Sequence, residues 1–167
     1  MIRLLLSTAL LVGSTTAASA QMKSSQPDAI AASVADCWVA VGPKAIDKLV
    51  LVERGWRAGS ISDPRGGPVD ATMGVFSKSG SNVVLLLMDN SPSCAIVSRV
   101  NRVADINLAA QATQRRLEAL DPQVKTARSG QSIVFLSLPK IAMLDGTGSK
   151  AKPGLRIVVG YQTPEKK

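Results

Sequence analysis

The chain contains two long segments in which apolar residues recur at the spacing of an α-helix. The first segment starts at Ser25, which is predicted to cap the helix, and at Pro27, which suits a first helical turn. Gly42-Pro43 ends the pattern. We therefore predict a helix between Ser25 and Gly42. Its apolar side chains fall on a single helical face, at Ile30, Val34, Cys37, Trp38 and Val41.

The second helical segment follows Asn101, a residue type that can cap a helix. It runs to about Leu120, where Asp121-Pro122 ends the pattern. The polar side chains of this segment are predicted to face water. The apolar face is formed by Val103, Ile106, Ala110, Thr113, Leu117 and Leu120.

Residues 43–56 are ambiguous between helix and strand. The run Val50-Leu51-Val52 favours a strand by propensity, whereas the spacing of the apolar residues from Ile46 onward favours a helix. Gly55 is well placed as a left-handed C-cap of such a helix, with Trp56 folded back onto its last turn. We favour the short helix and leave the strand open.

Short apolar stretches separated by turn residues predict six strands. Residues 79–82 form the turn of a hairpin, and the Gly- and Pro-rich stretch from Ala58 to Val69 is predicted to be an exposed loop. Residues 83–88 are apolar at every position, so this strand is expected to be central and covered on both faces. The strands cover residues 72–78, 83–88, 94–100, 132–138, 140–144 and 155–161.

These elements predict an α+β fold with the order α-(α)-β-β-β-α-β-β-β. Consecutive hairpins favour a largely antiparallel sheet, with the helices packed on it. No repeat or linker divides the chain, so residues 21–167 are expected to form a single domain with a frayed tail at 162–167. The order of elements resembles that of secretion-chaperone-like α+β folds, a likeness of topology that implies no function.

The first twenty residues have the pattern of a bacterial secretory signal peptide. A cationic start precedes the apolar run from Leu4 to Val12, which at about nine residues is too short to span a membrane. The small residues Ala18-Ser19-Ala20 form a cleavage site before Gln21. We expect a periplasmic or secreted protein, and no transmembrane segment in the mature chain.

The chain is basic, with 20 Lys and Arg against 12 Asp and Glu, for a net charge of +8. Loss of Arg3 with the leader leaves 19 against 12, or +7. Nucleic acid is not an expected partner, because aromatic residues for base stacking are few and the charges are scattered. The basic balance is interpreted first as that of a soluble surface, and the alternative is an anionic envelope component or another protein as the partner. The candidate anion-binding residues are Lys150, Lys152 and Arg156.

Histidine is absent, which excludes Ser-His-Asp and Cys-His catalysis and His-based metal sites. No carboxylate cluster has metal-binding spacing, so neither a metal nor a cofactor is expected. The two cysteines, Cys37 and Cys94, are too far apart for a redox motif. In an oxidising compartment such a pair is usually a structural disulfide, with two buried thiols as the alternative.

Two short motifs resemble catalytic or phosphate-binding sequences. The segment Ser137-Leu138-Pro139-Lys140 has the serine-to-lysine spacing of serine enzymes that use a lysine. The segment Ser149-Lys150-Ala151-Lys152 has the same spacing, but the partner motifs of those enzymes are absent. Asp145 to Lys150 is interpreted as a plain hairpin loop. We therefore expect a non-enzymatic binding or envelope accessory protein. The alternative is a small periplasmic enzyme whose carboxylates or Ser-Lys pair meet only in the fold.

Overall fold

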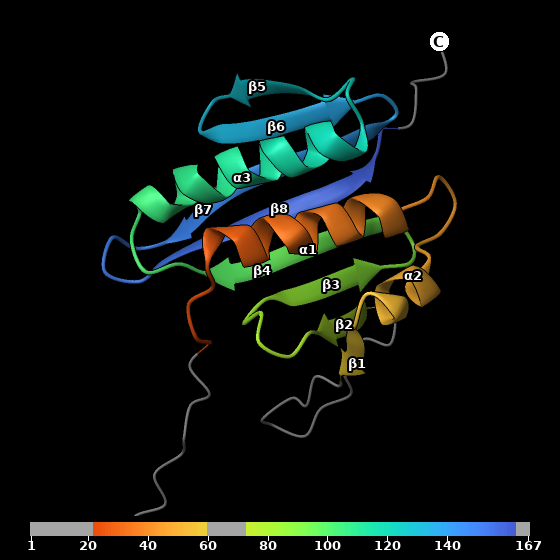
Figure 1. Cartoon of the computed structure of the whole chain (residues 1–167), viewed down its shortest axis with the longest axis horizontal. Coiled ribbons are helices and arrows are strands. Elements are labelled where there is room, and N and C mark those ends of the chain that lie inside the picture. The colour runs from red at the N-terminus through yellow and green to blue at the C-terminus, as the bar shows by residue number, and fades with distance from the viewer. Residues whose placement is uncertain (1–21, 60–72, 163–167) are drawn as a thin grey trace, which may run out of the picture.

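A computed structural model of the protein describes residues 22–59 and 73–162. Eight strands in these residues form one sheet, and every neighbouring pair is antiparallel (Figure 1). The strand order is β1-β2-β3-β4-β8-β7-β6-β5, so two meanders join through their last strands, β4 and β8. The strands are β1 Arg57–Gly59, β2 Met73–Ser77, β3 Val84–Met88, β4 Ser93–Arg99, β5 Lys125–Ser129, β6 Ser132–Ser137, β7 Lys140–Gly148 and β8 Pro153–Tyr161.

Two long helices, α1 (Pro27–Ala40) and α3 (Ala104–Leu120), lie side by side on one face of the sheet (Figure 1). The short helix α2 (Lys48–Glu53) packs against α1 near β2 and β3. This arrangement confirms the predicted α+β class. Within the described ranges, none of the helices is both long and apolar enough to cross a membrane.

The core lies between the helices and the sheet, and a disulfide runs through it. Cys37 of α1 is bonded to Cys94 of β4, with their Cα atoms 5.9 Å apart, and neither residue is exposed. The predicted disulfide is therefore confirmed. It fastens α1 to a central strand of the sheet. Large side chains that are almost fully buried around it include Trp56, Phe135, Ile30, Leu85 and Ile157.

The ambiguous segment 43–56 contains the helix that the sequence favoured. The Asp47 side chain caps α2 by accepting hydrogen bonds from the backbone N–H groups of Leu49 and Val50. At the other end, Gly55 adopts a φ of 86°, and its N–H donates to the Val52 carbonyl. The Trp56 N–H donates to the Leu51 carbonyl at 3.0 Å, which completes a Schellman ending.

The two long helices begin differently from the prediction. The N-cap of α1 is Gln26 rather than Ser25, whose hydroxyl instead donates to the Asn82 carbonyl. For α3, Asn101 is not the cap either. The Asp105 carboxylate accepts a hydrogen bond from the backbone N–H of Arg102. The side chain that caps the start of α3 therefore comes from its first turn and not from the preceding Asn101.

Two strands, β1 and β5, are missing from the predicted order. Both lie at edges of the sheet, and every residue in them is exposed. Neither has the alternation of apolar and polar residues by which strands are detected. Ala58 and Gly59, assigned to a loop, belong to β1, and the rest of that predicted loop lies outside the described residues.

The C-terminal hairpin is longer than predicted. Strand β7 continues through Asp145 to Gly148, so only residues 149–152 form the turn to β8. Gln162, placed in a frayed tail, donates its backbone N–H to the Pro139 carbonyl at 2.8 Å. The other residues of that tail, 163–167, lie outside the described part of the chain.

Strand β3 corrects the expectation of a strand covered on both faces. Leu85 and Leu87 point to the helices and are fully buried, whereas Val84, Leu86 and Met88 point to the other face and are only partly buried. Among the described residues, helices cover one face of the sheet alone (Figure 1).

Candidate functional site: a cationic groove beside helix α1

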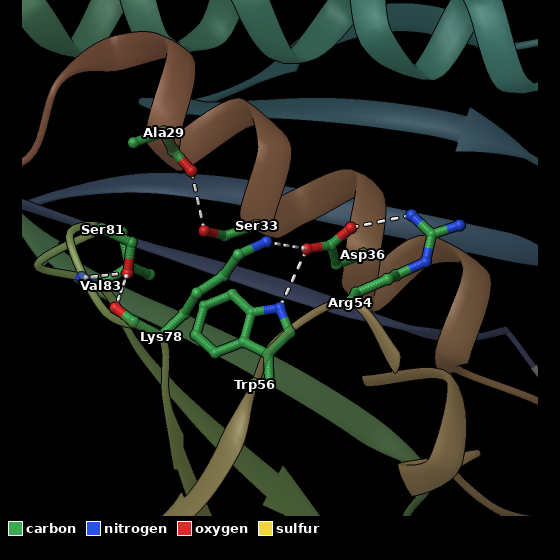
Figure 2. A network of polar contacts seen from close by, with 8 residues as sticks. All are labelled: Ala29, Ser33, Asp36, Arg54, Trp56, Lys78, Ser81 and Val83. Carbon is green, nitrogen blue, oxygen red and sulfur yellow. Dashed lines mark hydrogen bonds and ion pairs between the residues drawn. The ribbon is translucent and has the colours of Figure 1, made fainter. Parts of the chain in front are cut away.

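A buried carboxylate, Asp36, gathers three side chains from separate parts of the chain (Figure 2). Its Oδ1 accepts a hydrogen bond from Arg54 Nη1 at 2.8 Å, and its Oδ2 accepts one from Trp56 Nε1 at 2.9 Å. Lys78 Nζ lies 3.5 Å from Oδ2. The Asp36 side chain is only 10% exposed, so these partners replace the water that its charge would otherwise hold.

The local fold explains why these residues meet. Asp36 immediately precedes Cys37, whose disulfide fixes this turn of α1 against the sheet. Arg54 is the C-cap of α2, and the Schellman ending turns Trp56 back into the core. Lys78 follows directly after β2, and its ammonium lies 5.8 Å from the centre of the Trp56 ring, within the range of a cation–π contact.

A groove of about 400 Å³ lies on the solvent side of this cluster, between α1 and the C-terminal end of α3. Three cationic side chains line it, those of Arg54, Lys78 and Arg116, and Asp36 is its single acidic residue. Its apolar surface comes from small or aliphatic residues of the two helices, namely Ala32, Ala35, Ala119 and Leu120.

A second hollow of about 210 Å³ shares Ala32, Asp36 and Lys78 with the groove. It follows α1 toward its N-terminal half and ends at the turn formed by residues 79–81. The hydroxyls of this region have internal partners, since Ser33 donates to the Ala29 carbonyl and Ser81 to the Lys78 carbonyl (Figure 2). The two hollows are therefore adjacent, and Asp36 and Lys78 lie where they meet.

The positive charges in the groove exceed the negative charge by two. Asp36 engages Arg54 and Lys78, while Arg116 makes no ion pair with any residue that the structure describes. Such an arrangement attracts anions, and the apolar walls favour a ligand with a hydrocarbon part beside its charge. We name this feature the cationic groove.

The anion-binding residues predicted from sequence lie elsewhere and do not form one cluster of unpaired charge. Lys150 and Lys152 are exposed in the turn between β7 and β8. Arg156 lies on β8, where its Nη2 is 3.2 Å from Asp145 Oδ2. Asp145 also accepts a hydrogen bond from the Ser132 hydroxyl. The Ser132 hydrogen bond and, to a smaller extent, Arg156 lower the pKa of Asp145.

Ser137 and Lys140 face each other across β6 and β7. The Ser137 hydroxyl and, to a smaller extent, the Gln123 backbone N–H lower the pKa of Asp121. Burial lowers the pKa of Lys140, whose ammonium donates to the Trp38 carbonyl in the last turn of α1. A cation at this position interacts favourably with the C-terminal end of a helix, so a structural role is enough to explain the presence of Lys140.

The second match to that spacing, Ser149 and Lys152, forms the β7–β8 turn through its backbone. No group of three potential metal-ligating side chains occurs in the described residues. Asp63 and Asp70 lie outside the described residues.

Four residues of the groove, Asp36, Arg54, Lys78 and Arg116, were not predicted from the sequence. One usable signal was present, because Asp36 is an acidic residue directly beside the apolar pair Cys37-Trp38 in a segment predicted to pack in the core. A charge in that position calls for a buried partner. The identity of the partner depends on long-range packing, since Arg54, Trp56 and Lys78 are 18 to 42 residues away along the chain.

No known protein family matches the chain, and neither a curated protein nor a solved structure is similar to it. Similarity therefore assigns no function, and the resemblance in element order to secretion-chaperone-like folds adds none.

Proposed function

We propose that the protein is an exported, non-enzymatic binding protein that holds an anionic amphiphile of the bacterial envelope in the cationic groove. The observation that carries this proposal is the excess of two positive charges, from Arg54, Lys78 and Arg116 against Asp36, along an apolar groove of about 400 Å³. That volume lies within the usual range for small-molecule sites. The ligand class is a hydrocarbon chain with a phosphate or carboxylate head.

Asp36 supports binding rather than catalysis. Its two oxygens accept hydrogen bonds from Arg54 and Trp56, and only 10% of the side chain is exposed, so the carboxylate and, through it, one cation are held in a fixed position. A general base needs a free lone pair directed at its substrate. The groove thus offers fixed positive charge and apolar surface, which are features of a binding site.

Two features support export. The first twenty residues have the order of charge, apolar run and small residues that secretory leaders share. The Cys37–Cys94 bond is of a kind that persists in oxidising compartments and is rare in the cytosol.

A catalytic function based on Ser137 and Lys140 is the weaker proposal. The two residues lie opposite each other, and the lowered pKa of Lys140 suits a general base. The ammonium is, however, directed at the Trp38 carbonyl and lies near the rings of Trp38 and Tyr161, which favours a structural role.

The test is a calorimetric titration with dodecyl phosphate below its micelle-forming concentration. We expect saturable binding that weakens as salt rises from about 50 to about 200 mM, because screening reduces the attraction of the groove for the head group. Replacing a charged hydrogen-bond donor, as in Arg116→Gln, should weaken binding by about tenfold. Arg116 is the best target because Asp36 does not depend on it.

The matched control is Arg115→Gln, which removes the same charge from the neighbouring exposed position outside the groove. This variant should bind as the unaltered protein does, and so should Lys152→Gln in the β7–β8 turn. Equal weakening in all three variants would show that the general basic charge binds the probe, and would refute the groove. If inorganic phosphate binds as tightly as dodecyl phosphate, the apolar walls do not contribute to binding. If dodecyl maltoside binds as tightly as dodecyl phosphate, the cations do not contribute.

A further inference from the structure

The sheet face opposite the helices carries a continuous row of apolar side chains. Cross-strand register places one residue from each of six neighbouring strands in this row. Its members alternate with core residues such as Cys94, whose disulfide to α1 identifies the opposite face as the helix side. From β2 to β6 the row reads Val75, Leu86, Ala95, Val158, Met143 and Val134.

One neighbouring row on this face is largely apolar, whereas the other combines two valines with polar and charged residues. Met88 lies on one side of the central row, together with Ile141 and Leu136 farther along the sheet. Val84 and Val97 lie on its other side. We call these three rows on strands β2, β3, β4, β8, β7 and β6 the open face.

The open face is an extended surface whose centre is apolar. Its side chains are partly buried by one another, and the most exposed apolar member, Met143, is 38% exposed. Adjacent strands lie about 4.8 Å apart and alternate residues about 6.8 Å apart, so the three rows cover about 500 Å². The largest apolar patch on a monomeric soluble protein is typically about 300–600 Å² and often marks an interaction site, so the open face is large enough to be one.

The charge on the open face favours a second copy of the chain as the occupant. The chain as a whole has a net charge of +8, which opposes self-association over most of the surface. The three rows, by contrast, contain one basic and one acidic residue, Arg156 and Asp145, which are paired at 3.2 Å. Two open faces therefore meet without net repulsion.

The available area also fits a dimer. Two faces of about 500 Å² bury about 1,000 Å² in total, the lower bound for a specific interface between proteins. Sheets pack face to face about 10 Å apart with their strands nearly aligned, and their side chains interdigitate between them. The aliphatic side chains of the central row suit this packing against a second copy.

We propose that the protein forms a homodimer in which the open faces of two copies pack together, giving helix, sheet, sheet and helix layers. This proposal does not rest on the cationic groove, which lies on the helix side. The dimer carries two such grooves on opposite outer surfaces.

The test is sedimentation equilibrium of the full purified protein, with its disulfide intact, from about 1 to about 100 µM. We expect a particle of twice the chain mass that dissociates on dilution. Met143→Lys and Leu86→Lys place an unpaired charge in the interface and should each raise the dimer dissociation constant at least tenfold. Circular dichroism and the absence of free thiols check that each variant is folded.

Leu108→Lys is the matched control, because Leu108 is an exposed leucine of α3 on the helix side, 46% exposed. It should leave the dimer unchanged. If Leu86→Lys fails to fold, Met143→Lys at the more exposed position carries the test. A single-chain mass at about 100 µM would overturn the proposal, as would dimers that Met143→Lys leaves intact or that Leu108→Lys dissociates equally. If the protein is a monomer and Met143→Lys destabilises it as strongly as a core substitution does, the chain itself covers the open face. That result would also overturn the proposal.

Discussion

Individual carboxylates in this protein have different tasks, and their surroundings determine which. Asp36 is buried and holds Arg54 and Trp56 in place beside the groove. Asp105 accepts the backbone N–H of Arg102 and so completes the start of α3. Asp145 links β6, β7 and β8 through the Ser132 hydroxyl and Arg156. A single residue type thus organises a site, a helix end and a sheet.

Asp145 should make the stability of the protein depend on acid pH. The Ser132 hydroxyl and Arg156 lower its pKa in the folded state below the ordinary value of 3.8. The unfolded chain therefore takes up the proton more readily, so the stabilising contribution is present above about pH 4 and is lost as the pH falls through the lowered pKa. In thermal melts, Asp145→Asn should lower the melting temperature at pH 6, and the difference from the unaltered protein should shrink toward pH 2.5.

Ser132→Ala provides a second check on the same group, because it removes the donor that lowers the Asp145 pKa most. It should reduce the acid dependence in the same direction as Asp145→Asn, but by less. A constant difference between Asp145→Asn and the unaltered protein across this pH range would contradict the assignment.

At the residue scale the sequence indicated the disulfide but not the groove. Cys37 and Cys94 are the only two cysteines, so their pairing required no knowledge of the fold. Arg54, Lys78 and Arg116 are three among 20 basic residues, and nothing in their local sequence separates them from the rest. They become a set only when α1, α3 and the end of β2 pack together.

At the element scale, the end of α2 shows how backbone conformation sets the position of a functional residue. Gly55 has a φ of 86°, a region that side chains other than glycine rarely adopt. This residue reverses the chain between Arg54 and Trp56, and so directs both toward Asp36. The Gly55-Trp56 pattern was recognisable in the sequence because a Schellman ending has a local signature.

Gly55→Ala should therefore destabilise the protein by about 1 kcal/mol, since a Cβ is disfavoured at this φ. Urea unfolding followed by circular dichroism measures the change. Gly59→Ala is the control. Gly59 has no such φ, and an added Cβ would lie 3.8 Å from the Val75 carbonyl oxygen, an ordinary contact. Equal losses in the two variants would show that the backbone conformation of Gly55 is not the cause.

The missed strands have a physical explanation at the same scale. Strands are detected from sequence because one face is buried and the other is not. Residues of β5 such as Thr126 and Ala127 are exposed on both faces, so their strand conformation comes from pairing with β6. Conversely, the apolar run in β3 predicted burial of both faces, whereas residues on one face are only partly buried. An apolar sequence does not show whether another layer covers the face.

At the scale of the whole molecule, the disulfide joins the helical layer to the sheet. Cys37 and Cys94 are separated by 57 residues, and their bond links α1 to β4. A cross-link over this length restricts the unfolded chain and stabilises the fold by about 4 kcal/mol in the chain-entropy account. The three strands between the two cysteines, β1, β2 and β3, all lie on the same side of β4 in the sheet.

Replacing both cysteines with alanine should lower the free energy of unfolding by about 2–5 kcal/mol and leave the fold intact. Urea unfolding gives the first quantity, and circular dichroism tests the second. Reduction of the unaltered protein under the same conditions should produce a loss of similar size. If the reduced and oxidised proteins unfold at the same urea concentration, the bond does not stabilise the fold.

The two outermost strands also determine how far the protein can assemble. Strand β1 has only three residues, and β5 carries Lys125 and Arg128 on a fully exposed strand. Short or charged edges discourage other chains from adding to a sheet by backbone hydrogen bonding. Growth sideways into fibrils is thereby disfavoured, and the open face is used up once a single partner has bound. Self-association should then close at a particle of fixed size instead of extending into an open-ended assembly.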